Sequence, residues 1–253
     1  MSNSHDADAR GTGLGGIAHA GFPLADAQWM ALARDFGSRI RAVEFLLVAS
    51  RAKPGLRFAL RAEQLDHAKH SAKTYGLCWD VSDFGITLAD QTSGKGEGHY
   101  SNKGVMSARP GALRFFYCAP DAAAVGTLKA AEAARDSLRF GTLLGYPECC
   151  CQFFQAHEKE LAACDNDFTS LVAVPSGASF PWWMNIYAKG HDACVLSHFP
   201  CSLGCGESHR FAEGCVSALT GISPGLALSL QGRLMGDIAA PPAPHPLHFF
   251  PVQ

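Results

Sequence analysis

The sequence of 253 residues lacks several features that would place it in a common class of protein. No apolar run reaches the roughly 18 residues that a membrane-spanning helix requires. Basic and acidic residues nearly balance, at 21 and 23, so there is no excess of positive charge for a nucleic-acid backbone. Residues 1–6 contain neither the basic nor the apolar segment of a secretory signal peptide. We therefore expect a cytoplasmic protein with no membrane or nucleic-acid partner.

Cysteine, in contrast, is abundant, with ten residues in the chain. Because the cytosol keeps thiols reduced, clustered cysteines there indicate a metal site or catalysis rather than a disulfide framework. Half of the cysteines stand singly among apolar or small neighbours, which is typical of small buried side chains: Cys78, Cys118, Cys164, Cys194 and Cys215. The other five fall into two blocks.

The apolar pattern predicts a mixed, helix-rich α/β protein with a single compact domain over residues 21–238. Residues 1–20 are polar and glycine-rich and are expected to be disordered. Residues 239–253 are rich in proline and are expected to form an extended tail. Helices are expected at 25–36, 62–75, 121–135, 147–163 and 210–219, strands at 43–48, 56–60, 78–90 and 113–118, a polar loop at 91–103 and a linker at 140–145.

The first cysteine block, residues 145–154, reads Gly-Tyr-Pro-Glu-Cys-Cys-Cys-Gln-Phe-Phe. Pro147 is typical of the first helical residue, where a missing N–H costs no hydrogen bond. The cysteines would then lie in the first turn, where the helix dipole favours the thiolate. The second block, residues 198–208, has the same order, because Cys201 and Cys205 follow Pro200. We expect a shared site between two helix N-termini.

The ligands of such a site can be narrowed by helix geometry. Adjacent residues point about 100° apart around a helix, so at most two of the three consecutive cysteines can face one ion. Cys149 and Cys150, or Cys150 with its other neighbour Cys151, give four thiolates together with Cys201 and Cys205. Replacing one of them with His198 gives three thiolates and an imidazole. Both sets suit zinc or an iron–sulfur cluster. The spacing of the cysteines matches neither the paired knuckles of common zinc modules nor that of a ferredoxin. The sequence therefore does not decide between zinc and an iron–sulfur cluster.

Both blocks resemble those of a known family. L-G-Y-P-E-C-C-x-x-F-F at residues 144–154 and H-F-P-C-S-x-x-C-x-x-S at residues 198–208 are similar to blocks of an uncharacterised prokaryotic family, catalogued as a domain of unknown function. The resemblance spans residues 100–215 and implies one cysteine site, with no activity to transfer. Cys151 is an addition to the family pattern, and it leaves open which cysteines of the triplet are ligands.

The favoured hypothesis is an iron–sulfur (4Fe–4S) enzyme that acts on a small-molecule substrate. If only three cysteines bind, one iron stays open and can act as a Lewis acid. Glu148, His198 and Asn185 are the candidate catalytic residues, with Ser202 a further candidate for proton transfer or orientation. One alternative is a non-catalytic protein with a structural zinc site. Another is a thiol–disulfide redox enzyme, in which Cys149 or Cys150 attacks and a cysteine of the second block resolves.

Overall fold

The computed structural model describes residues 23–88, 104–163, 171–172, 182–184, 192–234, 236–239 and 248–251. The helices are α1 (Asp26–Asp35), α2 (Arg39–Ala49), α3 (Ala62–Thr74), α5 (Ala122–Ala133), α6 (Ser137–Leu143), α7 (Glu148–Ala156), α8 (Glu158–Ala163), the 3-10 turn η2 (Trp182–Met184), α9 (Gly206–Ile222) and α10 (Pro224–Leu234). The strands are β1 (Leu56–Leu60), β2 (Cys78–Val81), β3 (Ile86–Leu88), β4 (Gly104–Met106), β5 (Arg114–Ala119), β6 (Gly236–Ala239) and β7 (His248–Pro251). This mixture of helix and sheet in one compact domain confirms the expected α/β class.

A three-stranded antiparallel sheet in the order β1-β5-β2 separates two cores. Side chains alternate between the faces of a strand, so Phe58 and its cross-strand partner Phe116 enter one core, whereas Phe115 and Tyr117 enter the other. The larger core is completed by α1, α2, α3, α9 and α10. The smaller core is completed by α5, α6 and the β3 strand. The sheet is therefore buried on both faces.

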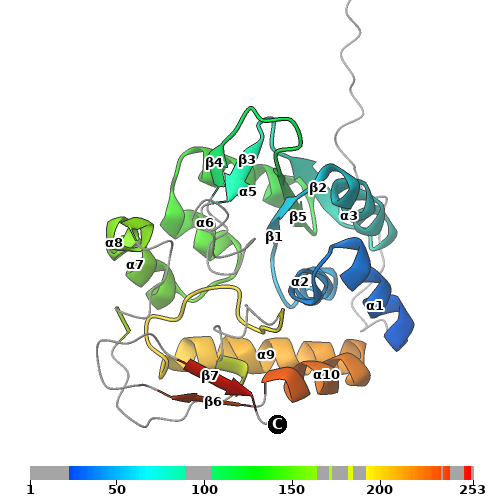
Figure 1. Ribbon diagram of the computed structural model, residues 1–253, viewed down its shortest axis with the longest axis vertical. Coiled ribbons are helices and arrows are strands. Elements are labelled where there is room, and N and C mark those ends of the chain that lie inside the picture. The colour runs from blue at the N-terminus through cyan, green and yellow to red at the C-terminus, as the bar shows by residue number, and fades with distance from the viewer. Residues whose placement is uncertain are drawn as a thin grey trace, which may run out of the picture.

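The antiparallel pair α9 and α10 lies at one end of the molecule, and the sheet with α3 and α5 lies at the other (Figure 1). The helix α2 lies between them and packs against both β1 and α9. On another side, α6 packs against α7. This arrangement brings the start of α7 close to the chain that enters α9.

Several expected elements are confirmed. The helices expected at 25–36, 62–75 and 121–135 are α1, α3 and α5. Gly76 ends α3 with a φ of +64°, a left-handed conformation that glycine adopts without strain. The Asp121 carboxylate caps α5 by accepting the Ala124 N–H at 2.8 Å. The strands expected at 56–60 and 113–118 are β1 and β5.

The strand expected at 43–48 is wrong, because these residues lie in α2. Every one of them except Glu44 is buried, so the run has neither the alternation of a strand nor the stripe of a surface helix. The N-terminus of α2 is fixed from a distance: the Asp192 carboxylate accepts the N–H of Arg39 at 2.7 Å and the hydroxyl of Ser38 at 2.6 Å. These contacts add to the local N-cap, in which the Ser38 hydroxyl accepts the N–H of Arg41 at 3.3 Å. The strand β1, which follows α2, pairs antiparallel with β5.

Two boundaries near the first cysteine block are also different. The linker expected at 140–145 overlaps α6, whose N-cap Asp136 accepts the N–H of Arg139 at 2.9 Å. The helix expected to continue to residue 163 is interrupted at His157, which is the C-cap of α7, and α8 follows. The first cysteines therefore sit on a short helix that packs against α6.

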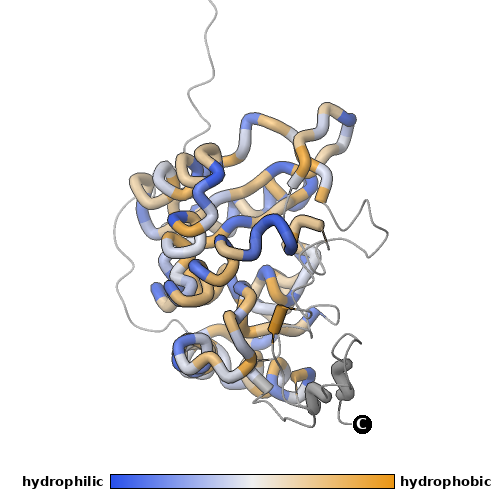
Figure 2. Tube along the Cα trace, turned by 90° about the vertical axis from the view of Figure 1, so that its left-hand side faces the viewer, coloured by the Kyte–Doolittle hydropathy of each residue, from blue (hydrophilic) through white to orange (hydrophobic). Residues whose placement is uncertain are grey.

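Of the described residues, none belongs to a helix that is both long and apolar enough to cross a membrane. Hydrophobic and hydrophilic residues are interspersed along the described part of the chain (Figure 2). In the expected tail, residues 248–251 form β7, which pairs antiparallel with β6 at residues 236–239. Residues 1–20 and the loop at 91–103 lie outside the described residues.

Candidate metal centre

The turn that leads into α7 is held by contacts with a distant part of the chain. Gly145 has a φ of +81°, and a Cβ at this position would meet Cδ of Pro54 at 2.6 Å. Only glycine combines this backbone conformation with so close an approach. Next to it, the ring of Tyr146 lies 5.3 Å from the Lys53 ammonium group. Pro147 was expected to be the first helical residue, but it is the N-cap, and α7 begins at Glu148. Cys149 and Cys150 therefore lie in the first turn.

The second block reaches the same place without a helix at Pro200, where one was expected. Residues 198–205 form bends and turns, and the Cys205 N–H donates to the Ser202 carbonyl at 3.1 Å. The helix α9 begins at Gly206, with Cys205 as its N-cap. The Sγ of Cys205 accepts the N–H of Ser208 at 3.5 Å, as a serine or aspartate oxygen does in an ordinary cap. Cys201 and Cys205 are thus brought together by a turn.

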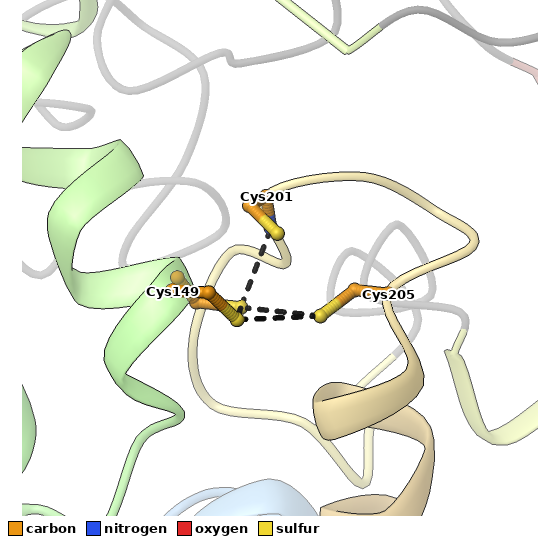
Figure 3. Close-up of side chains that lie close together, drawn as sticks. Cys149, Cys201 and Cys205 are labelled. Carbon is orange, nitrogen blue, oxygen red and sulfur yellow. Dashed lines mark hydrogen bonds between the residues drawn. The ribbon is translucent and has the colours of Figure 1, made fainter.

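The structure brings the sulfurs of Cys149, Cys150, Cys201 and Cys205 within 4.8 Å of one another. The Sγ of Cys205 lies 3.7 Å from those of Cys149 and Cys150, which are themselves 3.8 Å apart. Figure 3 shows Cys149 on α7 and Cys201 and Cys205 on the facing segment, with their side chains turned toward one another. The expected proximity of the two blocks is confirmed. This group of four cysteines can hold a metal ion.

Cys151 belongs to a different contact. Its side chain is buried against α6, where a Cβ on Gly141 would meet the Cys151 Sγ at 2.7 Å. Its thiol lies 3.7 Å from the carbonyl oxygen of Tyr146, to which it donates. Cys151 therefore helps α6 and α7 to approach closely, and the cluster takes only two cysteines of the triplet.

The single cysteines that the structure describes are buried, as expected. Cys118, Cys194 and Cys215 lie in the larger core and Cys78 in the smaller one. Cys164 lies outside the described residues.

The surroundings of the cluster shift the acidities of its thiols in different directions. Burial raises the pKa of Cys150, and burial with hydrogen bonding to Cys205 raises that of Cys201 to about 11. Burial also opposes ionisation of Cys205, but hydrogen bonding with Ser208 and with the neighbouring thiols of Cys201 and Cys149 lowers its pKa to about 7. Without a metal, the negative charge therefore gathers first on Cys205. A thiolate is the form that binds metals and attacks electrophiles.

His198 lies behind the cluster rather than in it. It is 5% exposed, and its Nε2 is 2.8 Å from the Ser208 Oγ, which is in turn 3.2 Å from the Cys150 Sγ. Its ring packs against the rings of Tyr146 and Phe211, with centroids at 5.1 and 5.5 Å. His198 thus contacts the sulfur cluster through Ser208.

The other candidate catalytic residues are not drawn into the cluster by any described contact. Glu148 is exposed in the first turn of α7 and accepts a hydrogen bond from Gln152 at 3.0 Å. Ser202 contributes its carbonyl to the turn before α9. Asn185 lies outside the described residues. Their catalytic roles stay predictions.

Sequence reasoning assigned no role to Ser208. A signal was present, since Ser208 follows Cys205 by three residues, shortly before the helix expected at 210–219. This is the spacing at which an N-cap side chain meets the N3 residue.

Comparisons with protein-family models, curated proteins and solved structures found no match to this chain.

Proposed function

We propose that Cys149, Cys150, Cys201 and Cys205 bind one zinc ion in a tetrahedral four-thiolate site. The observation that carries this proposal is the spacing of the sulfurs. With zinc–sulfur bonds of about 2.3 Å, the sulfurs of a tetrahedral site lie about 3.8 Å apart. The three separations that join Cys149, Cys150 and Cys205 are 3.7, 3.7 and 3.8 Å. A single ion at the centre satisfies these distances without rearrangement of α7 or α9.

The same spacing favours a single ion over the iron–sulfur cluster of our first hypothesis. In a four-iron cluster each cysteine binds a different iron atom, so the ligand sulfurs must stand much further apart than those of one ion. The four sulfurs lie within 4.8 Å of one another, and this closeness supports one ion bound by all four. Tetrahedral thiolate sites are typical of zinc.

Four protein ligands make a closed site, which is the arrangement of structural zinc rather than catalytic zinc. The site joins α7 to the start of α9, segments that are 56 residues apart in sequence at Cys149 and Cys205. Metal binding of this kind supplies folding free energy, on the order of 10 kcal/mol in small zinc peptides. We therefore infer that zinc stabilises the fold by joining α7 to the start of α9. We also propose, from the sequence, that the protein is cytoplasmic. The resemblance of the two blocks to the prokaryotic family would then reflect this shared centre.

A thiol–disulfide redox enzyme is the second candidate, because one observation favours it. Cys205 combines a pKa of about 7 with a neighbouring thiol, Cys149, at 3.7 Å. A thiolate next to a resolving thiol is the arrangement that such enzymes use. This function requires the cysteines to be free of metal in the active protein.

Anaerobic purification followed by metal and acid-labile sulfide analysis separates these functions. The zinc proposal predicts a colourless protein with one zinc per chain and no sulfide. Replacement by Co²⁺ should produce the visible bands of tetrahedral thiolate coordination. A brown protein with iron and sulfide would establish a cluster instead. A metal-free protein with a reversible dithiol couple would establish the redox enzyme.

A further inference from the structure

Ser208 contacts two of the four clustered cysteines at once. It is fully buried, its N–H donates to the Cys205 Sγ at 3.5 Å, and its Oγ lies 3.2 Å from the Cys150 Sγ. Cys150 also accepts the N–H of Cys201 at 3.4 Å. The side chain of Ser208 is therefore the link between the sulfur cluster and His198, whose Nε2 lies 2.8 Å from the same hydroxyl.

The direction of this link follows from counting protons. A metal-bound thiolate carries no proton and can only accept a hydrogen bond, whereas a serine hydroxyl has one proton to donate. When Cys150 binds metal, Ser208 must donate to its sulfur. The hydroxyl oxygen is then left to accept, so His198 must carry a hydrogen on Nε2. In the metal-free thiol, Cys150 can donate to Ser208, and Ser208 can donate to His198 instead.

We propose that His198 is a positioning residue for the metal site, which acts through Ser208 by fixing the hydroxyl proton on the Cys150 sulfur. The inference rests on the proposed four-thiolate site. Four thiolates around a divalent ion carry excess negative charge, and hydrogen bonds to the sulfurs offset it. Groups of this kind that orient a ligand typically contribute 10- to 100-fold in metal affinity.

The packing of His198 supports a positioning role. Its ring is held between Tyr146, which follows the glycine turn of the first block, and Phe211 on α9. Both rings come from the elements that carry the cysteines. The imidazole is thus fixed to the same two segments that the metal joins, and its Nε2 stays directed at Ser208.

The zinc affinity of matched variants tests the proposal, measured by competition with a chromophoric chelator on the full chain. Ser208→Ala removes the hydroxyl but keeps the N–H to Cys205, and His198→Phe removes the donor. Each should weaken zinc binding by about 10- to 100-fold. The double variant should be no weaker than either single one, because both changes break the same link. His198→Gln keeps an N–H donor and should recover much of the affinity.

Two control variants test whether zinc affinity falls when any buried serine or any histidine is replaced. Ser71→Ala removes another buried serine, from α3. His157→Phe changes the C-cap of α7. Both should retain the affinity of the unaltered chain.

A second readout separates positioning from packing and needs no variant. The ¹⁵N chemical shifts of the His198 ring in the zinc-loaded protein should show a hydrogen on Nε2. A zinc-loaded protein with a bare Nε2, or wild-type affinity in Ser208→Ala and His198→Phe, would overturn the positioning role while leaving the zinc site intact. A wild-type chain that binds no zinc would overturn both proposals.

Discussion

Gly145 and Pro54 lie so close together that a Cβ on the glycine would meet the proline ring at 2.6 Å. Pro54 lies in the turn between α2 and β1, and Gly145 lies in the turn that leads into α7. The contact therefore joins these two turns. It also requires the left-handed φ of +81° at Gly145. The placement of the first cysteine block therefore depends on Gly145, which is not a metal ligand.

Gly145→Ala should destabilise the protein by about 2–4 kcal/mol, because the side chain adds both backbone strain and overpacking. Gly126 in α5 is the matched control, since a Cβ there would meet nothing within 4 Å. Gly126→Ala should stabilise the protein by about 1 kcal/mol, because alanine is the better helix former. Urea unfolding of the two variants measures both changes. Similar stabilities for the two would contradict the tight contact.

Serine substitutions in the cluster should remove metal and lower stability together. Cys201→Ser and Cys205→Ser should each lose stoichiometric zinc and lower the melting temperature by roughly 10 °C or more, because zinc binding supplies folding free energy. Cys151→Ala and Cys78→Ser are the controls, because the first packs on α6 and the second lies in the smaller core. Both should keep their zinc. Zinc loss from Cys151→Ala would place the wrong pair of the triplet at the metal.

The sequence was sufficient for features that depend on local chemistry. Asp121 marks the start of α5 because its carboxylate caps the helix within three residues. The short apolar and aromatic runs at residues 56–60 and 113–118 mark buried strands. Adjacent residues on a helix diverge, so it was predictable that no more than two cysteines of the triplet would meet the second block.

Features that depend on distant contacts were not predictable. The choice of Cys149 and Cys150 over Cys151 follows from α6, where the bare Cα of Gly141 accommodates the Cys151 sulfur. The helix α2 was taken for a strand because its apolar run is buried on nearly all sides, and part of the contacts that hold its start come from the distant Asp192. The preference for one ion over a cluster rests on sulfur distances, which no spacing in the sequence encodes.

Lys53 and Glu44 form a buried ion pair near the first block, and their contributions to the free energy of unfolding should be strongly coupled. Lys53 is 1% exposed, and its ammonium group donates to the Glu44 carboxylate and, at 2.7 Å, to the Ser197 hydroxyl. Lys53→Met leaves the Glu44 carboxylate without its partner and should cost about 3–5 kcal/mol. Combining it with Glu44→Gln should cost less than the sum of the single changes, because the uncompensated charge is gone. A double-mutant cycle by chemical unfolding measures the coupling, and strictly additive costs would argue against a strong pair.

The stability of the protein should fall at alkaline pH in part through Cys215, a core residue on α9. Burial raises its pKa to about 11 from an ordinary value of 9.0; Lys53 opposes the shift and Glu44 adds to it. The unfolded chain therefore loses this proton at a lower pH than the folded chain. The contribution is fully present below pH 9 and is lost as the pH rises toward 11. At about 1.36 kcal/mol per pKa unit, the loss is on the order of 3 kcal/mol.

Cys215→Ala isolates this contribution. The variant has a lower stability at every pH because it leaves a small cavity in the core, but it lacks the ionising thiol. All other groups titrate in both proteins, so their effects cancel in the difference between the two pH profiles. Urea unfolding under reducing conditions from pH 8 to pH 10.5 should show the profiles converging as the pH rises. If the two profiles stay parallel over this range, the Cys215 thiol is not held protonated by the fold.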